Sequence, residues 1–148
     1  VNGGGTGGAA RAVLFALATH GVKRIDIVAR NPEKAADLLR HAGIASGVIA
    51  LGDALPSAQL LVNATSLGMT GQPALDIDLA PLSDDATVYD IVYAPLETPL
   101  LAAARARGLR TLDGLEMLVG QADLAFEFFF DAQAPREHDA ELRALLTA

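Results

Sequence analysis

Cysteine and tryptophan are absent from this 148-residue sequence, and aromatic residues make up 5% of it. The lack of cysteine excludes disulfides, thiolate metal sites and a cysteine nucleophile, and it favours a reducing, cytoplasmic location. With few aromatic rings, the core must be built mainly from aliphatic helix and strand faces. The sequence also lacks a leader of charged and then apolar residues and an apolar run long enough to cross a bilayer, so we expect a soluble protein.

Basic residues are scarce as well. The sequence has 11 lysines and arginines against 18 aspartates and glutamates, which gives a formal net charge of −7. Nucleic-acid-binding proteins need a basic surface that displaces counterions, so we expect neither nucleic acid nor an anionic membrane as a partner. The length fits one domain that spans residues 1–148.

Segments with a strand pattern alternate with segments that have a helix pattern. Short apolar runs predict strands at residues 24–29, 47–51, 60–64, 87–92 and 110–112. Helical spacing of apolar residues predicts helices at 8–20, 32–43, 99–108, 115–130 and 136–146. A helix between consecutive strands implies a parallel crossover. We therefore expect an α/β fold with a doubly wound, Rossmann-like parallel sheet and helices on both of its faces.

The first residues, VNGGGTGGAARAV, are rich in glycine and lead into the first predicted helix. Such glycines permit a tight turn whose backbone N–H groups approach a pyrophosphate at the helix N-terminus. Gly3, Gly5 and Gly8 match G-x-G-x-x-G, whereas Gly5, Gly7 and Ala10 match G-x-G-x-x-A and leave the better helix start. The motif alone fits a flexible tail equally well. Because this turn normally follows a complete strand, we expect the first strand of the sheet to be truncated.

The strand at 24–29 ends where a dinucleotide-binding fold places the residue that selects the cofactor. An acid there binds the ribose 2′-hydroxyl of NAD, whereas an arginine accommodates the 2′-phosphate of NADP. Here Ala29 is followed by Arg30 and Asn31, and Lys34 lies one turn into the next helix. Arg30 offers a planar, permanent charge, and Asn31 can cap the helix while donating to a ligand. This favours NADP; the alternative is that Arg30 and Lys34 are solvated surface charges.

Three further segments are similar to signatures of one enzyme family. Residues 63–69 read NATSLGM, residues 88–101 read VYDIVYAPLETPLL, and residues 113–122 read DGLEMLVGQA. Together with GTGGAARA at 5–12 they cover nearly the whole chain, and their order and spacing resemble the shikimate dehydrogenase family. One departure is Ala29-Arg30-Asn31, where the family usually has Asn-Arg-Thr or Asn-Arg-Ser.

The resemblance implies that the chain is the NADP-binding domain of such an enzyme and assigns roles to its residues. The cofactor-binding residues that we expect are Gly5, Thr6, Gly7, Gly8, Ala9, Ala29, Arg30, Asn31, Lys34, Thr65, Ser66, Ile91 and Gly114. The positions matching Tyr93 and Gln121 contact the shikimate carboxylate or hydroxyls in the family, and we expect the same here. For Thr65 and Ser66 local turn capping is an equally good interpretation, and for Tyr93 a buried structural role competes.

The residues that transfer protons in this family are missing from the sequence. The family uses a lysine paired with an aspartate in an N-terminal domain, whereas the lysines here, Lys23 and Lys34, fall in a turn and on the adenine-side helix. Asp90 and Asp113 fit structural carboxylates at a strand end and a turn. We therefore expect no catalytic residue and no metal in this chain, the N-terminal substrate domain to be absent, and the isolated chain to be inactive.

The leading functional hypothesis is the NADP(H)-binding domain of an oxidoreductase that reversibly reduces 3-dehydroshikimate to shikimate in aromatic amino-acid biosynthesis. One alternative is a quinate/shikimate dehydrogenase paralogue that uses NAD. Another is a non-catalytic NADP-binding module. The aromatic residues at 127–130 (EFFF) are expected to face the missing domain.

Overall fold

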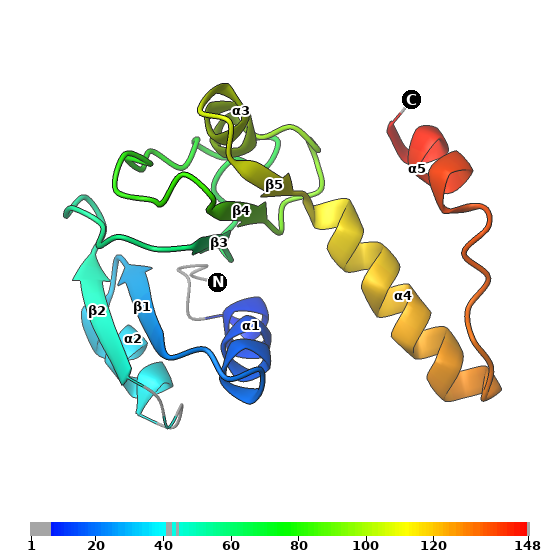
Figure 1. Cartoon of the computed structure of the whole chain (residues 1–148), viewed down its shortest axis with the longest axis horizontal. Helices are drawn as coiled ribbons and strands as arrows, with labels where there is room; N and C mark the ends of the chain where they lie inside the picture. The colour runs from blue at the N-terminus through cyan, green and yellow to red at the C-terminus, as the bar shows by residue number, and fades with distance from the viewer. Residues whose placement is uncertain (1–6, 41–42, 44, 148) are drawn as a thin grey trace.

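The computed structural model describes residues 7–40, 43 and 45–147, which fold into helices and parallel strands (Figure 1). In chain order the elements are α1 (Gly8–Thr19), β1 (Arg24–Ala29), α2 (Pro32–Leu39), β2 (Ala45–Ala50), β3 (Leu60–Asn63), β4 (Thr87–Asp90), α3 (Pro99–Ala106), β5 (Arg110–Leu112), α4 (Gly114–Phe130) and α5 (Asp139–Thr147). The α/β fold predicted from the sequence is therefore confirmed.

Three helices begin at a side chain that caps their first turn. The Asn31 side chain accepts a hydrogen bond from the Lys34 N–H at the start of α2, as predicted. Thr98 accepts from the Leu101 N–H at the start of α3, and Asp113 caps α4. Each cap satisfies backbone donors that have no partner inside the helix. In contrast, α1 begins after Gly7 with no side-chain cap.

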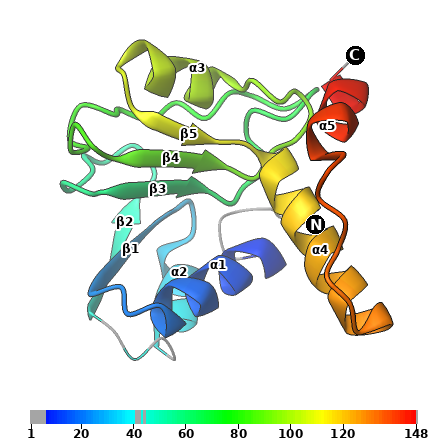
Figure 2. The same cartoon turned by 45° about the vertical axis from the view of Figure 1, so that its right-hand side comes forward.

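The strands form two parallel sheets rather than one. β1 pairs with β2, and β3, β4 and β5 pair in that order, so the described strands make a two-stranded and a three-stranded sheet. Figure 2 shows β3, β4 and β5 side by side, with β1 and β2 beneath them. The predicted continuous sheet is thus interrupted between β1 and β3. The strand that was expected to be truncated falls before residue 7, outside the described residues.

Several predicted boundaries differ from the structure: α2 ends at Leu39 instead of residue 43, and β2 spans Ala45–Ala50 instead of 47–51. The strand predicted to reach residue 92 ends at Asp90, because the Asp90 side chain accepts a hydrogen bond from the Val92 N–H and turns the chain there. The last helix begins at Asp139 instead of residue 136. Arg136 lies ahead of it and forms ion pairs with Asp139 and, across the connection, with Asp123 of α4.

The buried core lies between the three-stranded sheet and α3. It is aliphatic, as the composition predicts, and comprises Leu79, Leu82, Ala86, Val88, Leu100, Leu101, Ala104 and Leu109. Leu101 of α3 and Val88 of β4 are completely buried in this core. This half of the molecule therefore has a closed core that supports the loops at the end of β4.

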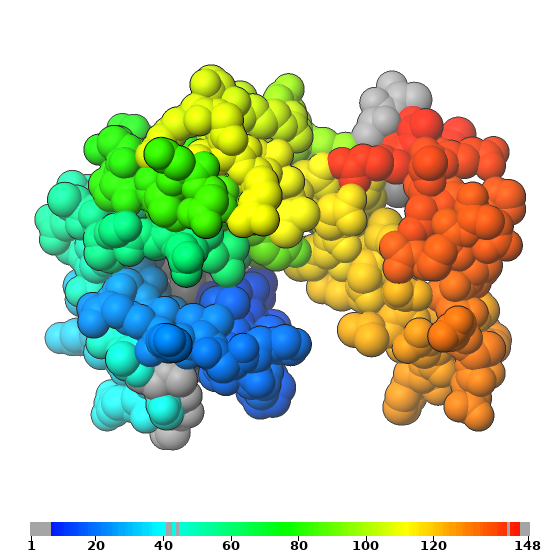
Figure 3. All heavy atoms as spheres, viewed as in Figure 1, coloured from blue at the N-terminus to red at the C-terminus, as the bar shows by residue number. Residues whose placement is uncertain are grey.

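The C-terminal half of α4 and α5 project from the rest of the chain (Figure 3). The side chains of Phe128, Phe129 and Phe130 are largely exposed there, at 83%, 76% and 66%. Phe126 and Phe130 stack one turn apart with ring centroids separated by 4.7 Å. No helix among the described residues is both long and apolar enough to span a membrane.

Replacing Leu101 with alanine is predicted to lower the free energy of unfolding by about 2–5 kcal/mol, because it leaves a cavity in a closed aliphatic core. Leu124→Ala is the matched control, since Leu124 is 69% exposed on α4; its effect should stay within about 0.5 kcal/mol. Urea denaturation of both variants measures the difference. Equal losses would show that the α3–β4 layer is not the stabilising core.

Candidate functional site at the carboxyl ends of the strands

The three segments singled out from the sequence follow three neighbouring strands. Residues 64–69 follow β3, residues 91–98 follow β4, and α4 begins just after β5. Because β3, β4 and β5 are parallel neighbours, their carboxyl ends lie at one edge of the sheet. Open α/β sheets bind their ligands at this edge.

Asn63, the last residue of β3, fixes the loop that follows it. Its Oδ1 accepts hydrogen bonds from the N–H of Thr65 at 3.0 Å and from the hydroxyl of Thr65 at 2.7 Å. The Thr65 hydroxyl in turn accepts from the N–H of Leu67 at 3.0 Å. The hydroxyl predicted to meet the cofactor therefore caps a turn, which was the competing interpretation from the sequence.

Asp90, the last residue of β4, is completely buried and ties three segments together. Its Oδ1 accepts from the Asn63 side-chain amide at 2.9 Å and from the Val92 N–H at 3.0 Å. Its Oδ2 accepts from the Thr98 hydroxyl at 2.7 Å, and Thr98 also caps α3. A buried carboxylate is stable only with such donors. Asp90 is thus a structural residue, as expected.

Backbone contacts hold the same loops side by side. The N–H of Thr70, beyond β3, donates to the Ala94 carbonyl at 2.8 Å, and the N–H of Gly114 donates to the Val92 carbonyl at 3.2 Å. A Cβ on Gly114 would lie 2.3 Å from the Ile91 carbonyl oxygen, too close for any other residue. The lack of a side chain at Gly114, predicted to admit a ligand, is therefore required by the packing of α4 against the β4 loop.

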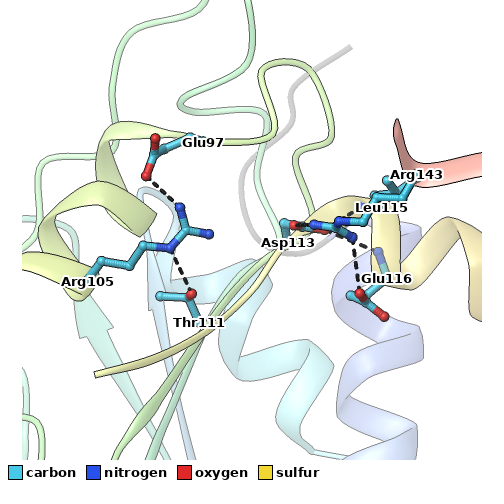
Figure 4. A network of polar contacts seen from close by, with 7 residues as sticks. All are labelled: Glu97, Arg105, Thr111, Asp113, Leu115, Glu116 and Arg143. Carbon is cyan, nitrogen blue, oxygen red and sulfur yellow. Dashed lines mark hydrogen bonds and ion pairs between the residues drawn. The ribbon is translucent and has the colours of Figure 1, made fainter. Parts of the chain in front are cut away.

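Asp113 connects the start of α4 to α5 (Figure 4). Its Oδ1 accepts from the N–H groups of Leu115 and Glu116, at 3.1 and 3.3 Å. Its Oδ2 pairs with the Arg143 guanidinium, which also donates to Glu116 at 3.1 Å. The carboxylate was expected to serve a turn, and it does so while it also anchors α5. Nothing near Asp113 in the sequence signals Arg143, which lies on another helix.

A second polar cluster in Figure 4 links α3 to the strand beside it. Arg105 of α3 donates to the Thr111 hydroxyl of β5 at 3.2 Å and to the Glu97 carboxylate at 2.5 Å. These side chains are substantially exposed, so each ion pair contributes little stability by itself. They connect α3 to β5 and to Glu97 in the loop after β4.

The other half of the candidate site lies at α1 and at the end of β1. An added Cβ on Gly7 or Gly8 would meet no described atom within 4 Å, so none of the residues that the structure describes covers the start of α1. Arg30, just after β1, and Lys34, in the first turn of α2, are both exposed. The positive end of the α2 dipole adds to their charge, and Glu33 in the same turn partly offsets it.

A cavity of about 710 Å³ joins the two halves. Its lining includes three predicted site residues, Ala29, Arg30 and Thr65. Ser66 and Ile91 are half-buried beside it, and Gly114 is buried in the β4 loop contact. Tyr93 is 55% exposed and Gln121 is exposed on α4; neither lines the cavity. Ala9 lies half-buried in the first turn of α1, whereas Gly5 and Thr6 fall outside the described residues.

The sequence predicted no role for Asn63 or Arg143, and for Thr98 it predicted only the start of the helix at 99–108. Asn63 and Thr98 each stand within a motif of the chain, so a polar residue at a strand end or before proline was the available signal. In the described part of the chain, no three histidine, aspartate or glutamate side chains are grouped as a metal site would need.

Two ionisable groups near Asp113 have a displaced pKa: the hydrogen bond to Asp113 raises the pKa of the Arg143 guanidinium, and the pKa of Tyr89 of β4 is raised as well. Burial raises the pKa of the Tyr89 phenol above its ordinary value, and the negative charges of Asp113 and Glu116 raise it further. The folded chain thus holds the phenolic proton more tightly than the unfolded chain. Stability is full below a pH of about 10 and falls as the pH rises above it.

Comparisons with known proteins agree with this architecture. No family model matches the chain. The chain is 62% identical over 144 residues to the NADP-dependent shikimate dehydrogenase of Sphingopyxis alaskensis, covering 97% of the chain and 53% of that protein. The chain spans about half the length of the curated relatives it matches.

Solved structures give the same result. The Thermus thermophilus shikimate 5-dehydrogenase in complex with NADP(H) and shikimate is 33% identical, with a TM-score of 0.80 over 95% of this chain and 52% of that one. The Corynebacterium glutamicum quinate dehydrogenase in complex with NAD is 37% identical, with a TM-score of 0.73 over 87% and 49%. The fold and its strand-end loops define a Rossmann-like domain of the dinucleotide-binding class. Within that class, the chain belongs to the shikimate dehydrogenase family.

Asp90→Asn is predicted to lower the free energy of unfolding by about 1–3 kcal/mol, because an amide nitrogen cannot accept the Thr98 proton. Thr98→Val removes the same bond from the other side. In the double variant, the loss of unfolding free energy should therefore be smaller than the sum of the two single losses by about 0.5–3 kcal/mol. As a control, Thr19→Val on α1 is combined with Asp90→Asn, and in that double variant the two losses of unfolding free energy should add. Simple additivity of Asp90→Asn and Thr98→Val in urea denaturation would contradict the coupling.

In the Tyr93→Phe variant, Tyr89 is the sole tyrosine, because the sequence has 2. Ultraviolet titration of its phenolate should give a midpoint above the ordinary value of about 10, and the midpoint should return to that value in denaturant. Substituting both Asp113→Asn and Glu116→Gln should lower the folded midpoint. A folded midpoint equal to the denatured one would disprove the burial of the phenol.

Proposed function

We propose that this chain is the NADP(H)-binding part of an enzyme that interconverts 3-dehydroshikimate and shikimate. The observation that carries the proposal is the start of α1, which has no side-chain cap and where no described atom lies within 4 Å of a Cβ added to Gly7 or Gly8. The other helices with an assigned cap, α2, α3 and α4, satisfy their first N–H groups with their own side chains. The free donors and dipole of α1 suit a pyrophosphate. The relatives are NADP-dependent shikimate dehydrogenases, and the nucleotide and substrate of the proposal are theirs.

The residues around this helix fit the remaining parts of a dinucleotide. Arg30 and Lys34 supply positive charge for a 2′-phosphate, and Asn31 keeps its amide NH₂ for a ligand while its oxygen caps α2. Small residues leave room for the dinucleotide near the backbone, namely Ala29, the N-cap Gly7, and Gly8 and Ala9 of α1. The loop residues Thr65, Ser66 and Ile91 and the buried Gly114 form the nicotinamide side. Gly5 and Thr6 belong to the same proposed set.

Bound NADP(H) would donate the hydride in its reduced form and accept it in its oxidised form, and the residues of this chain orient the reactants. Tyr93 and Gln121 are proposed to contact the substrate carboxylate or hydroxyls, since both side chains are exposed beyond the β4 loop and along α4. The buried Asp90 and Asp113 position these elements without touching the substrate. Lys23 lies just ahead of β1 and Lys34 is assigned to the 2′-phosphate, so the proton donor is assigned to the remainder of the enzyme. The chain alone should therefore be inactive.

The proposal includes a cytoplasmic location, which the cysteine-free sequence supports. It is tested by calorimetry of the chain with NADP and with NAD. Binding of neither nucleotide would refute it, and tighter binding of NAD would favour the quinate/shikimate paralogue. Shikimate oxidation should appear only after the remaining domain of a relative is added. NADP binding that never gives turnover with any such domain would favour the non-catalytic module.

Arg30→Gln is predicted to weaken NADP binding about 10–100-fold, because a charge-assisted hydrogen bond to phosphate contributes about 1.5–3 kcal/mol. NAD binding should not change, since NAD lacks the 2′-phosphate. Arg40→Gln is the control: Arg40 is an exposed arginine at the other end of α2, paired with Asp37. If Arg30→Gln weakened both nucleotides equally, Arg30 would not select the cofactor.

A further inference from the structure

Two hydrogen bonds from one residue join the loop after β3 to the loop that carries Tyr93. The N–H of Thr70 donates to the Ala94 carbonyl at 2.8 Å, and the Thr70 hydroxyl donates to the same carbonyl at 3.1 Å. A carbonyl oxygen has two lone pairs, so it can accept both bonds. Both bonds end one residue beyond Tyr93. Thr70 is therefore placed to fix the backbone of this loop next to Tyr93.

The backbone on the other side of Tyr93 is fixed by the buried part of the site. The N–H of Val92 donates to Asp90 at 3.0 Å, and the Val92 carbonyl accepts from the Gly114 N–H at 3.2 Å. Val92 is 4% exposed, whereas Tyr93 is 55% exposed. Packing thus does little to hold the Tyr93 side chain, so its place depends on the backbone bonds on both sides of it.

The loop that carries Thr70 is itself closed by hydrogen bonds. The N–H of Gly68 donates to the Pro73 carbonyl at 2.7 Å, and the N–H of Gln72 donates to the Met69 carbonyl at 2.8 Å. Gly68 has a φ of +90°, a conformation that residues with a Cβ rarely adopt, and this permits the turn. Both bonds span Thr70, so its N–H and hydroxyl are presented to the neighbouring loop from a turn of defined shape.

The same pair of bonds occurs at the opposite end of the two strands. The N–H and the hydroxyl of Ser83 donate to the Ala58 carbonyl at 3.1 and 3.2 Å. Ala58 lies ahead of β3 and Ser83 lies ahead of β4, so this contact is at the amino ends of the strands, at the edge of the sheet away from Tyr93. Ser83 therefore offers a matched reference for Thr70.

We propose that Thr70 is a positioning residue for substrate binding: by holding the Ala94 carbonyl with its N–H and its hydroxyl, it sets where the neighbouring Tyr93 meets the substrate. This rests on the proposed function, in which Tyr93 contacts the shikimate carboxylate or hydroxyls. Thr70 acts through the backbone of the loop. A change of its side chain should therefore weaken substrate binding and leave NADP binding unchanged, since the bond of the hydroxyl goes to the Tyr93 side of the site.

The test uses the chain together with the remaining domain of a relative and measures the KM for shikimate and for NADP during shikimate oxidation. Thr70→Val removes the hydroxyl but keeps the backbone N–H and the β-branched shape. It should raise the KM for shikimate about two- to tenfold, the effect of one lost hydrogen bond, and leave kcat and the KM for NADP unchanged. Thr70→Ser keeps a hydroxyl and should restore the KM. Ser83→Ala, which removes the equivalent hydroxyl at the other end of the strands, should change neither KM.

A double variant shows whether the effect passes through Tyr93. In the Tyr93→Phe background the phenolic hydroxyl is gone, so Thr70→Val should raise the KM for shikimate by a smaller factor than it does alone. Equal factors in both backgrounds would overturn the proposal, as would an equal effect of Ser83→Ala. An unchanged KM in Thr70→Val beside a raised KM in Tyr93→Phe would overturn it and leave the proposed function standing. An unchanged KM in Tyr93→Phe would overturn both the proposed role of Tyr93 and that of Thr70.

Hydrogen exchange of the chain by itself decides the case in which no added domain gives turnover. Mass spectrometry follows the amides of residues 93–97, which should exchange faster in Thr70→Val than in the unmodified chain because the loop opens more often. Thr70→Ser and Ser83→Ala should leave this exchange unchanged. If Thr70→Val also left it unchanged, the proposal would be overturned, whereas missing turnover with faster exchange would count against the proposed function alone.

Discussion

The candidate site depends on the hydrogen bonds of one buried carboxylate. Asp90 has no contact with water, and the cost of burying its charge is offset by the Asn63 amide, the Val92 N–H and the Thr98 hydroxyl. Those donors come from the end of β3, the loop after β4 and the cap of α3. Because the carboxylate needs all of them, the three segments are held in one arrangement.

The order imposed by Asp90 extends to the longest helix. The Val92 carbonyl accepts a hydrogen bond from the N–H of Gly114, and the carbonyls of the β4 loop leave no room for a side chain at Gly114. Asp113 then caps α4 and pairs with Arg143 of α5. This half of the molecule is therefore fixed by contacts from core to surface. The other half, formed by α1, β1, α2 and β2, lies across the cavity between β1 and β3, where the described residues make no strand pairing.

Much of the fold could be predicted because its signals are local. Asn31 and Pro32 marked the start of α2, and the runs at Arg24–Ala29 and Arg110–Leu112 were found with their boundaries. The structural roles of Asp90 and Asp113 were also expected from their place at a strand end and a turn. The Arg143 contact with Asp113 was not predicted, because the two residues are 30 positions apart and no periodicity connects them.

Periodicity, caps and ordered motifs act over a few residues each, so the helices, the parallel strands and the family could be predicted from the sequence alone. How those segments are used depends on the tertiary structure. It assigned the Thr65 hydroxyl to a turn and the missing side chain of Gly114 to the packing of backbone against backbone. The strands also form two sheets, with a cavity between β1 and β3. The reason is that strand pairing and burial depend on partners distant in the chain, which no local pattern specifies.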